Sequence, residues 1–385
     1  MSVRRVIVLG ATGSIGESAA KVARDIPDRV KLTGLAAHQN AKGLAQQANE
    51  FRPEAICIVD ESKREELRAA LAAGYSPKIL SGEAGLVELA AGAAPADIVL
   101  VAIVGTSGLR PALAAIEAGR DLAVASKEIL VMAGESVMGR AATRGVRVLP
   151  VDSEHNAIFQ CLEGRDSNTV KRLILTASGG PFRTSSVETI AAATRAQALK
   201  HPTWNMGAKI SIDSATLFNK GLEMIEARWL FDVEMDRVDV VVHPQSIVHS
   251  MVEFVDGSVL AQLSHSDMCF PIQYAICWPE RVPNRLRPLD FADLRKLDFE
   301  PPRRDVFPAL DLAAHAGRTG GTMPAVMNAA NEIAVAAFLE DRLDFPRIWE
   351  LVAKTMEAHR PTPHASLEEI LEADAWARKQ AASLR

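Results

Sequence analysis

Residues 6–16 read VIVLGATGSIG, in which four large apolar side chains precede three glycines spaced three positions apart. A short apolar run that ends at a glycine is typical of a strand buried on both faces of a sheet. The glycines permit a tight turn, and the first N–H groups of the helix that follows suit a pyrophosphate. The spacing is GxxGxxG rather than the usual GxGxxG. Its place between a predicted strand and a predicted helix nevertheless favours a dinucleotide-binding turn over a purely structural one.

The rest of the first 150 residues repeats this alternation of apolar runs and helical segments. Such alternation predicts right-handed crossovers in a parallel sheet. We therefore expect an α/β protein whose residues 1–150 form a Rossmann-like, doubly wound, dinucleotide-binding domain. The predicted strands of this domain are Val6–Leu9, Leu32–Ala37, Ala55–Val59, Ile98–Ile103, Leu122–Ala125 and Val146–Val151.

After residue 150 the pattern changes, and three further segments are predicted. Residues 151–278 are expected to form a central α+β catalytic domain with strands at Val238–Val242, Ser246–Phe254 and Ser258–Leu263. Residues 279–306 are rich in Pro, Arg and Asp and are predicted to be a linker. Residues 307–385 are predicted to be an α-helical C-terminal domain, in which Ser366 and Glu369 form a capping box.

The composition excludes several classes of protein. The chain has 385 residues, 24% of them charged, and a net charge of −5, which disfavours a nucleic-acid-binding protein. Uncharged apolar runs are too short to span a bilayer, so no membrane association is expected. The first apolar run stops at Gly10, which does not suit a signal peptide. Four scattered cysteines, without a CxxC pair, suggest reduced thiols in the cytoplasm.

The segment after the second predicted strand bears on the choice of dinucleotide. NAD-binding domains usually place an acidic residue near this point, where it binds the ribose 2′-hydroxyl. No acidic residue occurs between Asp28 and Glu50, so nothing there would repel a 2′-phosphate. NADP is therefore favoured, with His38, Gln39 and Lys42 as the polar groups at hand.

A possible metal site begins with Asp152-Ser153-Glu154. If these residues continue a strand, the side chains of Asp152 and Glu154 point the same way, as a hard divalent cation would need. An isolated pair of this kind is more often a solvated acidic loop. Glu223 could complete a site of three carboxylates, and Glu226 could support that site or pair with a basic side chain on the helix surface.

Further polar motifs between residues 178 and 223 indicate an anion site under a lid. Ser178-Gly179-Gly180 offers a hydroxyl and backbone N–H groups. The residues HPTWNMG at 201–207 favour a mobile lid near 199–208 over an aromatic anchor for a static loop. Asp213 or Ser214 could cap a helix and leave its N–H groups for a phosphate. On that helix Asn219 and Glu223 share a face, and Lys220 adds a positive charge.

These motifs, in this order, closely resemble the 1-deoxy-D-xylulose 5-phosphate reductoisomerase family over nearly the whole chain. The matching segments are GATGSIG at 10–16, VGTSGL at 104–109, SKE at 126–128, DSEHNAIFQ at 152–160, SGGPFR at 178–183, HPTWNMG at 201–207, DSATLFNKGLE at 213–223, HPQSIVHSMVEF at 243–254 and NAANEIAVAAFL at 328–339. The resemblance implies an NADPH-dependent enzyme that rearranges and reduces a phosphorylated sugar for isoprenoid synthesis. It also implies a homodimer.

The resemblance implies a role for each matching residue. The dinucleotide would contact Thr12, Gly13, Ser14, Ile15, Asn40, Ser126, Glu128 and Gly207, with His38 and Gln39 nearby. Mg²⁺, Mn²⁺ or Co²⁺ would bind Asp152, Glu154 and Glu223, and the last two would also contact the substrate. The substrate phosphate would bind Ser178, Ser214, Asn219 and Lys220. The sugar would contact Lys127, Ser153 and His201 beneath Trp204 and Met206. The catalytic residues would be Lys127, Asp152, Glu154, His201 and Glu223.

Three positions depart from the family pattern. Ser126 stands where the family often has Asn, which could weaken a cofactor contact. His38-Gln39-Asn40 stands where the family often has Gly-Lys-Asn, so the group that holds the 2′-phosphate stays open. Cys269 replaces an Arg, and there we expect only a change in packing.

Two other functions would also account for part of the sequence. An aspartate-semialdehyde-type NADP dehydrogenase also begins with a GATG turn, but it needs a reactive cysteine beside a base. Neither Cys161 nor Cys269 has a neighbour in sequence that suggests this. A non-catalytic NADP-binding module would have no use for a phosphate cluster and three carboxylates. For the expected reductoisomerase, a metal ion would polarise the substrate ketone, and NADPH would reduce the aldehyde formed by retro-aldol cleavage and re-addition.

Overall fold

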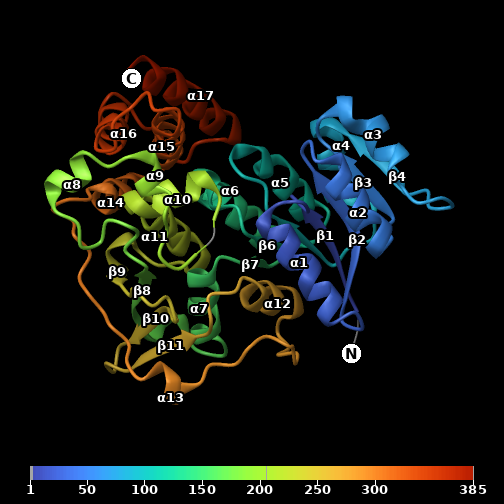
Figure 1. Cartoon of the computed structure of the whole chain (residues 1–385), viewed down its shortest axis with the longest axis horizontal. Helices are drawn as coiled ribbons and strands as arrows, with labels where there is room; N and C mark the ends of the chain where they lie inside the picture. Colours follow the sequence, from blue (N-terminus) through green and yellow to red (C-terminus); the bar gives the residue numbers. More distant parts are fainter. Residues whose placement is uncertain (1–2, 205, 385) are drawn as a thin grey trace. The chain divides into compact units, whose positions relative to one another are not determined.

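The computed structural model describes residues 3–204 and 206–384. The chain forms two compact units, each assembled from separate stretches of sequence (Figure 1). Unit 1 comprises Met1–Ile129, Val137–Asn156 and Asp267–Arg287, and unit 2 comprises Leu130–Ser136, Ala157–Ser266 and Pro288–Arg385. Residues of the predicted catalytic domain and of the predicted C-terminal domain thus share unit 2. The predicted division of the chain into domains and a linker stays a prediction.

Unit 1 is built on a seven-stranded parallel sheet with the strand order β4-β3-β2-β1-β5-β6-β7. Except for the edge strand β4, its strands are almost fully buried, as their continuous apolar sequences require. The strands are β1 Arg4–Leu9, β2 Val30–Ala37, β3 Ala55–Ile58, β4 Lys78–Ser81, β5 Ile98–Val101, β6 Asp121–Val124 and β7 Val148–Pro150. The predicted doubly wound sheet is confirmed, and β4 is a strand that the sequence analysis missed.

The strand order reverses between β1 and β5, because the chain moves outward from β1 to β4 and then returns to the other side of β1. In open α/β sheets, ligands bind at the carboxyl ends of the strands at such a switch point. The helices of this part of the chain are α1 Ser14–Asp25, α2 Ala41–Phe51, α3 Arg64–Ala69, α4 Gly82–Glu88, α5 Leu109–Glu117, α6 Lys127–Arg144 and α7 Ser153–Leu162.

A helix from much later in the chain completes unit 1. This helix, α12 Cys269–Cys277, packs against α1, β1 and β7 (Figure 1). The Arg4 guanidinium donates to the carbonyl of Ile276, and the thiol of Cys269 contacts the carbonyl of Ser18 at 3.7 Å. Cys269 is buried, so this departure from the family pattern lies at a packing contact within unit 1.

Unit 2 contains a four-stranded sheet and most of the helices that follow it. The strand order is β11-β10-β8-β9, with β8 and β9 parallel and the other neighbours antiparallel. The strands are β8 Val170–Ala177, β9 Val238–Val242, β10 Val248–Phe254 and β11 Val259–Leu263. The three predicted strands are confirmed, with β10 and β11 shorter than expected, whereas β8 was missed.

Helices α10 Ala208–Thr216 and α11 Phe218–Phe231 carry most of the polar motifs of unit 2. They are covered by the C-terminal helices, among which α15 Met323–Leu339, α16 Arg347–Glu357 and α17 Leu367–Ser383 pack side by side (Figure 1). The predicted capping box of Ser366 and Glu369 begins α17. The other helices of unit 2 are α8 Val187–Ala191, α9 Arg195–Ala198, α13 Phe291–Leu294 and α14 Ala309–Thr319. No helix within residues 3–204 and 206–384 is both long and apolar enough to cross a bilayer.

Candidate active site

The glycine-rich turn between β1 and α1 depends on the absence of side chains. Gly10 has φ +95°, and a Cβ atom there would lie 2.3 Å from the carbonyl oxygen of Ala102, after β5. A Cβ atom on Gly16 would lie 2.2 Å from the carbonyl oxygen of Ala11. Both separations are far below van der Waals contact, so these two glycines allow β1, β5 and α1 to approach closely.

The amino end of α1 is suited to an anion. Gly13 is the N-cap residue and supplies no side-chain hydrogen bond, while Gly13 and Ser14 are exposed to solvent. Thr12 and Ile15 flank them and are half-buried. This helix therefore begins at the sheet's switch point with N–H groups that no cap side chain occupies, as pyrophosphate binding requires.

Gln47 on α2 is a support of this turn that the sequence analysis missed. Its amide nitrogen donates to the carbonyl of Ala11 at 2.9 Å and to the carboxylate of Glu17 at 2.8 Å, and its side chain is buried. The sequence gives no signal for this contact, because Gln47 is 36 residues from Ala11 in a helix of ordinary composition.

The residues after β2 are exposed at the carboxyl edge of the sheet. His38, Gln39 and Asn40 are all open to solvent. Asn40 caps α2, because its side-chain oxygen accepts from the N–H of Gly43 at 3.0 Å. Which of these groups would hold a 2′-phosphate stays open.

The SKE motif lies where α6 begins. Ser126 is the N-cap residue, and its hydroxyl donates to the carbonyl of Ile103 at 2.6 Å. Ser126 and Glu128 are buried. Lys127 is also buried and forms an ion pair with Asp152. Lys127 and Asp152 are 25 residues apart, so their ion pair brings the SKE and DSE motifs together inside unit 1.

The DSE motif has a different backbone from the one predicted. Ser153 and Glu154 form the first turn of α7, so the argument from alternating side chains on a strand is wrong. Asp152 immediately precedes the helix, and its carboxylate accepts from the N–H of Ser153 at 3.1 Å. The Ser153 hydroxyl in turn donates to the carboxylate of Glu154 at 2.5 Å.

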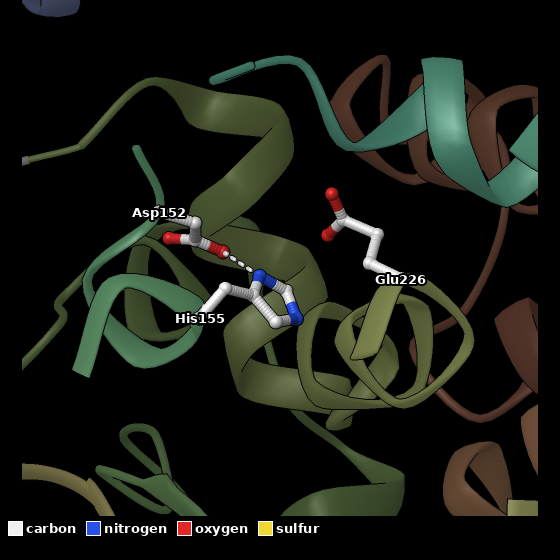
Figure 2. Close-up of side chains that lie close together, drawn as sticks. All are labelled: Asp152, His155 and Glu226. Atoms are coloured by element: carbon white, nitrogen blue, oxygen red, sulfur yellow. Dashed lines mark ion pairs between the residues drawn. The ribbon is translucent and has the colours of Figure 1, made fainter. Parts of the chain in front are cut away.

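Within residues 3–204 and 206–384, two groups of side chains have possible metal-ligand atoms within 4.8 Å of one another. One group is the predicted set of Asp152, Glu154 and Glu223. The other is Asp152, His155 and Glu226, whose side chains are drawn in Figure 2. In that view the Nδ1 atom of His155 faces a carboxylate oxygen of Asp152 at 3.8 Å. Glu226 is buried, which excludes the alternative of a pair on the helix surface.

The serine–glycine loop after β8 packs against the end of α10. Gly180 has φ +65°, and a Cβ atom there would lie 2.8 Å from the carbonyl oxygen of Ser214. The hydroxyl of Ser178 accepts from the N–H of Gly180 at 3.2 Å. Glycine at this position therefore lets the loop that carries Ser178 approach the helix that carries Ser214.

The predicted helix caps at residues 213 and 214 are wrong. Gly207 is the N-cap of α10, so Asp213 and Ser214 lie inside this helix. The helix stops at Leu217, whose φ of +65° starts α11 in a new direction. Ser214 thus lies near the end of one helix, whereas Asn219 and Lys220 lie in the first turn of the next.

A polar cluster occupies that first turn of α11. The side-chain amide of Asn219 donates to the carboxylate of Glu223 at 2.6 Å, which confirms that these two residues share a face. Lys220 also pairs with Glu223, and both of these side chains are at most 3% exposed. Unit 2 therefore holds a buried ammonium and a buried carboxylate next to each other.

His201 links the serine–glycine loop to the predicted lid. Its Nδ1 atom accepts the N–H of Trp204 at 2.8 Å, so the proton of the neutral ring belongs on Nε2. Nε2 then donates to the hydroxyl of Ser178, 2.8 Å away. Burial lowers the pKa of His201. The ring is thus held neutral, with one nitrogen on the lid backbone and the other on a candidate phosphate ligand.

The predicted lid is an irregular segment between α9 and α10. The ring of Trp204 lies 6.3 Å from the ring of His249 on β10, centroid to centroid. Met206 is half-buried, whereas Gly207 is exposed. Asn205, the remaining member of this motif, lies outside the described residues. The mobility of the lid stays a prediction.

Comparison with known proteins gives one family along the whole chain. Three sequence models match: "1-deoxy-D-xylulose 5-phosphate reductoisomerase" at residues 6–134, its C-terminal domain at 148–231, and "DXP reductoisomerase C-terminal domain" at 263–380. The 1-deoxy-D-xylulose 5-phosphate reductoisomerase of Gloeobacter violaceus is 50% identical over 98% of this chain and 96% of its own length. That of Chlorobium chlorochromatii is 52% identical over 98% of each chain.

Solved structures of proteins with this family name also match the chain. The 1-deoxy-D-xylulose 5-phosphate reductoisomerase from Zymomonas mobilis in complex with NADPH has 46% identity and a TM-score of 0.93, covering 100% of this chain and 99% of that one. A DOX-P reductoisomerase in complex with NADPH, fosmidomycin and magnesium has 41% identity and a TM-score of 0.92, covering 99% and 98% of the two chains.

Proposed function

This chain belongs to the 1-deoxy-D-xylulose 5-phosphate reductoisomerase family, and we propose the following division of roles among its residues. The protein is an NADPH- and metal-dependent oxidoreductase that converts 1-deoxy-D-xylulose 5-phosphate into 2-C-methyl-D-erythritol 4-phosphate, a precursor of isoprenoids. Its substrate is a phosphorylated small molecule.

Asp152, Glu154 and Glu223 would bind the divalent metal ion. All three offer carboxylate oxygens, which suit Mg²⁺ or Mn²⁺ better than softer metals. Glu223 is fully buried, and a charge there is favourable only with cationic or hydrogen-bonding partners. The metal ion, when bound, polarises the substrate carbonyl as a Lewis acid. Lys127, paired with Asp152, would orient that carboxylate and contact the sugar beside Ser153.

NADPH would bind at the glycine-rich turn and supply the hydride for the reduction. Support comes from the switch point between β1 and β5 and from the open N-cap of α1. The pyrophosphate would contact residues 12–15, whereas Asn40, Ser126, Glu128 and Gly207 would contact other parts of the cofactor.

The substrate phosphate would bind Ser178, Ser214, Asn219 and Lys220. The observation that carries this assignment is the buried ammonium of Lys220, in the same helical turn as Asn219. A buried positive charge suits a phosphate, whose binding energy can then orient the reacting carbons. His201 would position Ser178 through its Nε2–H and would also contact the sugar. Trp204 and Met206 would exclude water from above.

The thiols argue against the dehydrogenase alternative. Burial raises the pKa of Cys269 to about 12, so this thiol is protonated at neutral pH and is a poor nucleophile. All four cysteines are free and buried.

A direct test mixes purified protein with NADPH, Mg²⁺ and 1-deoxy-D-xylulose 5-phosphate and follows the absorbance of the reduced nicotinamide. We expect a decrease that needs both substrate and metal, and that Asp152→Asn abolishes. Undiminished turnover after exhaustive metal removal, with Mn²⁺ and Co²⁺ also absent, would contradict the metal site.

A homodimer and a cytoplasmic location complete the proposal. The family resemblance supports the dimer, and four reduced cysteines suit a reducing compartment. Sedimentation of the purified protein tests the first, and a single-subunit mass would contradict it. Cell fractionation tests the second.

A further inference from the structure

A buried carboxylate on α10 is held by a helix from the far end of the chain. Asp213 is 1% exposed, and its carboxylate contacts Lys209 and Asn331, both in unit 2. Lys209, one turn earlier on α10, places its Nζ atom 2.7 Å away. The side-chain amide of Asn331 on α15 donates to the same carboxylate at 2.8 Å.

This contact fixes how α10 lies against α15. The two helices pack side by side (Figure 1), and Asn331 is completely buried. The amide must present its nitrogen to Asp213, because its oxygen would be repelled by the carboxylate. A buried carboxylate that loses a hydrogen-bond donor is strongly destabilised. A shift of α10 along α15 would break the bond from Asn331 to Asp213 and would therefore lower the stability of the fold.

The position of α10 matters because Ser214, which directly follows Asp213 on this helix, is one of the proposed phosphate ligands. The backbone of Ser214 is also in close contact with Gly180, two residues from Ser178. The helix then ends at Leu217, and Asn219 and Lys220 follow at once. A displacement of α10 at Asp213 would therefore alter the spacing of all four proposed phosphate ligands.

We infer that Asn331 is a positioning residue for the substrate phosphate, acting through Asp213 and α10. This inference rests on the proposed phosphate site. It gives the C-terminal helices a part in substrate affinity beyond covering the core, since α15 would set the geometry of a site to which it contributes no ligand.

The test compares Asn331→Leu with Asn328→Leu. Both residues are asparagines on α15 with no exposed surface, one helical turn apart. Asn328 donates to Glu332 on its own helix at 2.9 Å, not to α10. Both variants should lose thermal stability. Only Asn331→Leu should raise KM for 1-deoxy-D-xylulose 5-phosphate, by about tenfold, with a smaller change in kcat and no change in KM for NADPH.

A charge exchange tests the contact itself. Asn331→Asp places two carboxylates together and should raise the substrate KM at least as much as Asn331→Leu. Adding Asp213→Asn restores a donor facing an acceptor and should return KM to within about threefold of wild type. If Asn331→Leu does not fold, Lys209→Met, which removes the other partner of Asp213, takes its place.

Each possible result of these kinetic measurements either supports or contradicts the inference. A substrate KM that is unchanged in Asn331→Leu, or raised equally in Asn328→Leu, overturns the inference. If Lys220→Met also leaves the substrate KM unchanged, the proposed phosphate site is itself wrong. If Lys220→Met raises KM while Asn331→Leu does not, only the positioning role fails.

Discussion

Replacement of Lys220 by Met removes a buried positive charge and keeps much of its volume. If the ammonium contacts the substrate phosphate, the variant loses a hydrogen bond between charged groups, which contributes roughly 1.5–3 kcal/mol. With about 1.4 kcal/mol per factor of ten, kcat/KM for 1-deoxy-D-xylulose 5-phosphate should fall by about 10- to 150-fold.

The same substitution also removes a cationic partner from Glu223, which is fully buried. The metal-free variant should therefore unfold at a lower temperature than wild type, and Mg²⁺ should recover part of that loss, because a cation at Glu223 replaces the missing charge. The kinetic comparison is made at saturating Mg²⁺ so that metal occupancy does not confound the phosphate effect.

The assay is NADPH oxidation at varied substrate concentration. Lys379→Met serves as control, because Lys379 is an exposed lysine of the same unit, on α17 and outside the proposed site. Unphosphorylated 1-deoxy-D-xylulose provides a second control, since its poor turnover should be nearly equal in wild type and Lys220→Met. If Lys220→Met keeps kcat/KM for the phosphorylated substrate within twofold of wild type, the phosphate assignment is refuted.

Three further predictions follow from the geometry. Gly10→Ala places a Cβ atom 2.3 Å from the Ala102 carbonyl, so it should cost about 1–3 kcal/mol of stability and weaken NADPH binding by fluorescence titration; Gly139→Ala, inside α6 with nothing within 4 Å, should leave NADPH binding unchanged and raise stability by about 0.5–1 kcal/mol, and equal effects would contradict the argument. Gln39→Lys adds a cation beside the expected 2′-phosphate and should lower KM for NADPH by up to about fivefold without changing KM for NADH; a parallel change in both would remove this residue from the 2′-phosphate site. Because burial lowers the pKa of His201, its contribution to stability should be complete above the ordinary histidine pKa of about 6.5 and lost as pH falls through the lowered value; urea titrations should show a smaller acid loss in His201→Gln, and an identical loss would count against it.

The parallel sheet of unit 1 was predictable because burial on both faces demands continuous apolar runs. The strand at Val238–Val242 in unit 2 was found with its observed bounds. Two strands were missed for physical reasons. In β4, only Leu80 is buried, so the strand carries little apolar pattern. In β8, Lys171 and Arg172 interrupt the apolar sequence because both are exposed.

Contacts between neighbouring side chains of the candidate site were easier to predict than its backbone. The Asn219–Glu223 contact follows from helical spacing alone. The helix start at Ser153 was not foreseen, because an apolar run before Asp152 also suits a strand that continues. The sequence pattern predicts Asp213 as an N-cap residue, yet the N-cap of α10 is Gly207 and Asp213 lies inside the helix. Its partner Asn331 is 118 residues away, and no local pattern can pair residues so far apart.

The place of α12 has a consequence for how the protein is made. This helix packs on α1 and β1, yet it is encoded about 250 residues later, as the contact between Ser18 and Cys269 illustrates. During synthesis on the ribosome, all seven strands of the parallel sheet emerge while the apolar surface awaiting α12 is still uncovered. Unit 1 can be completed only after residue 287 has been translated, when much of unit 2 has already emerged. A nascent chain stalled before α12 would expose that surface and would be a natural substrate for chaperones.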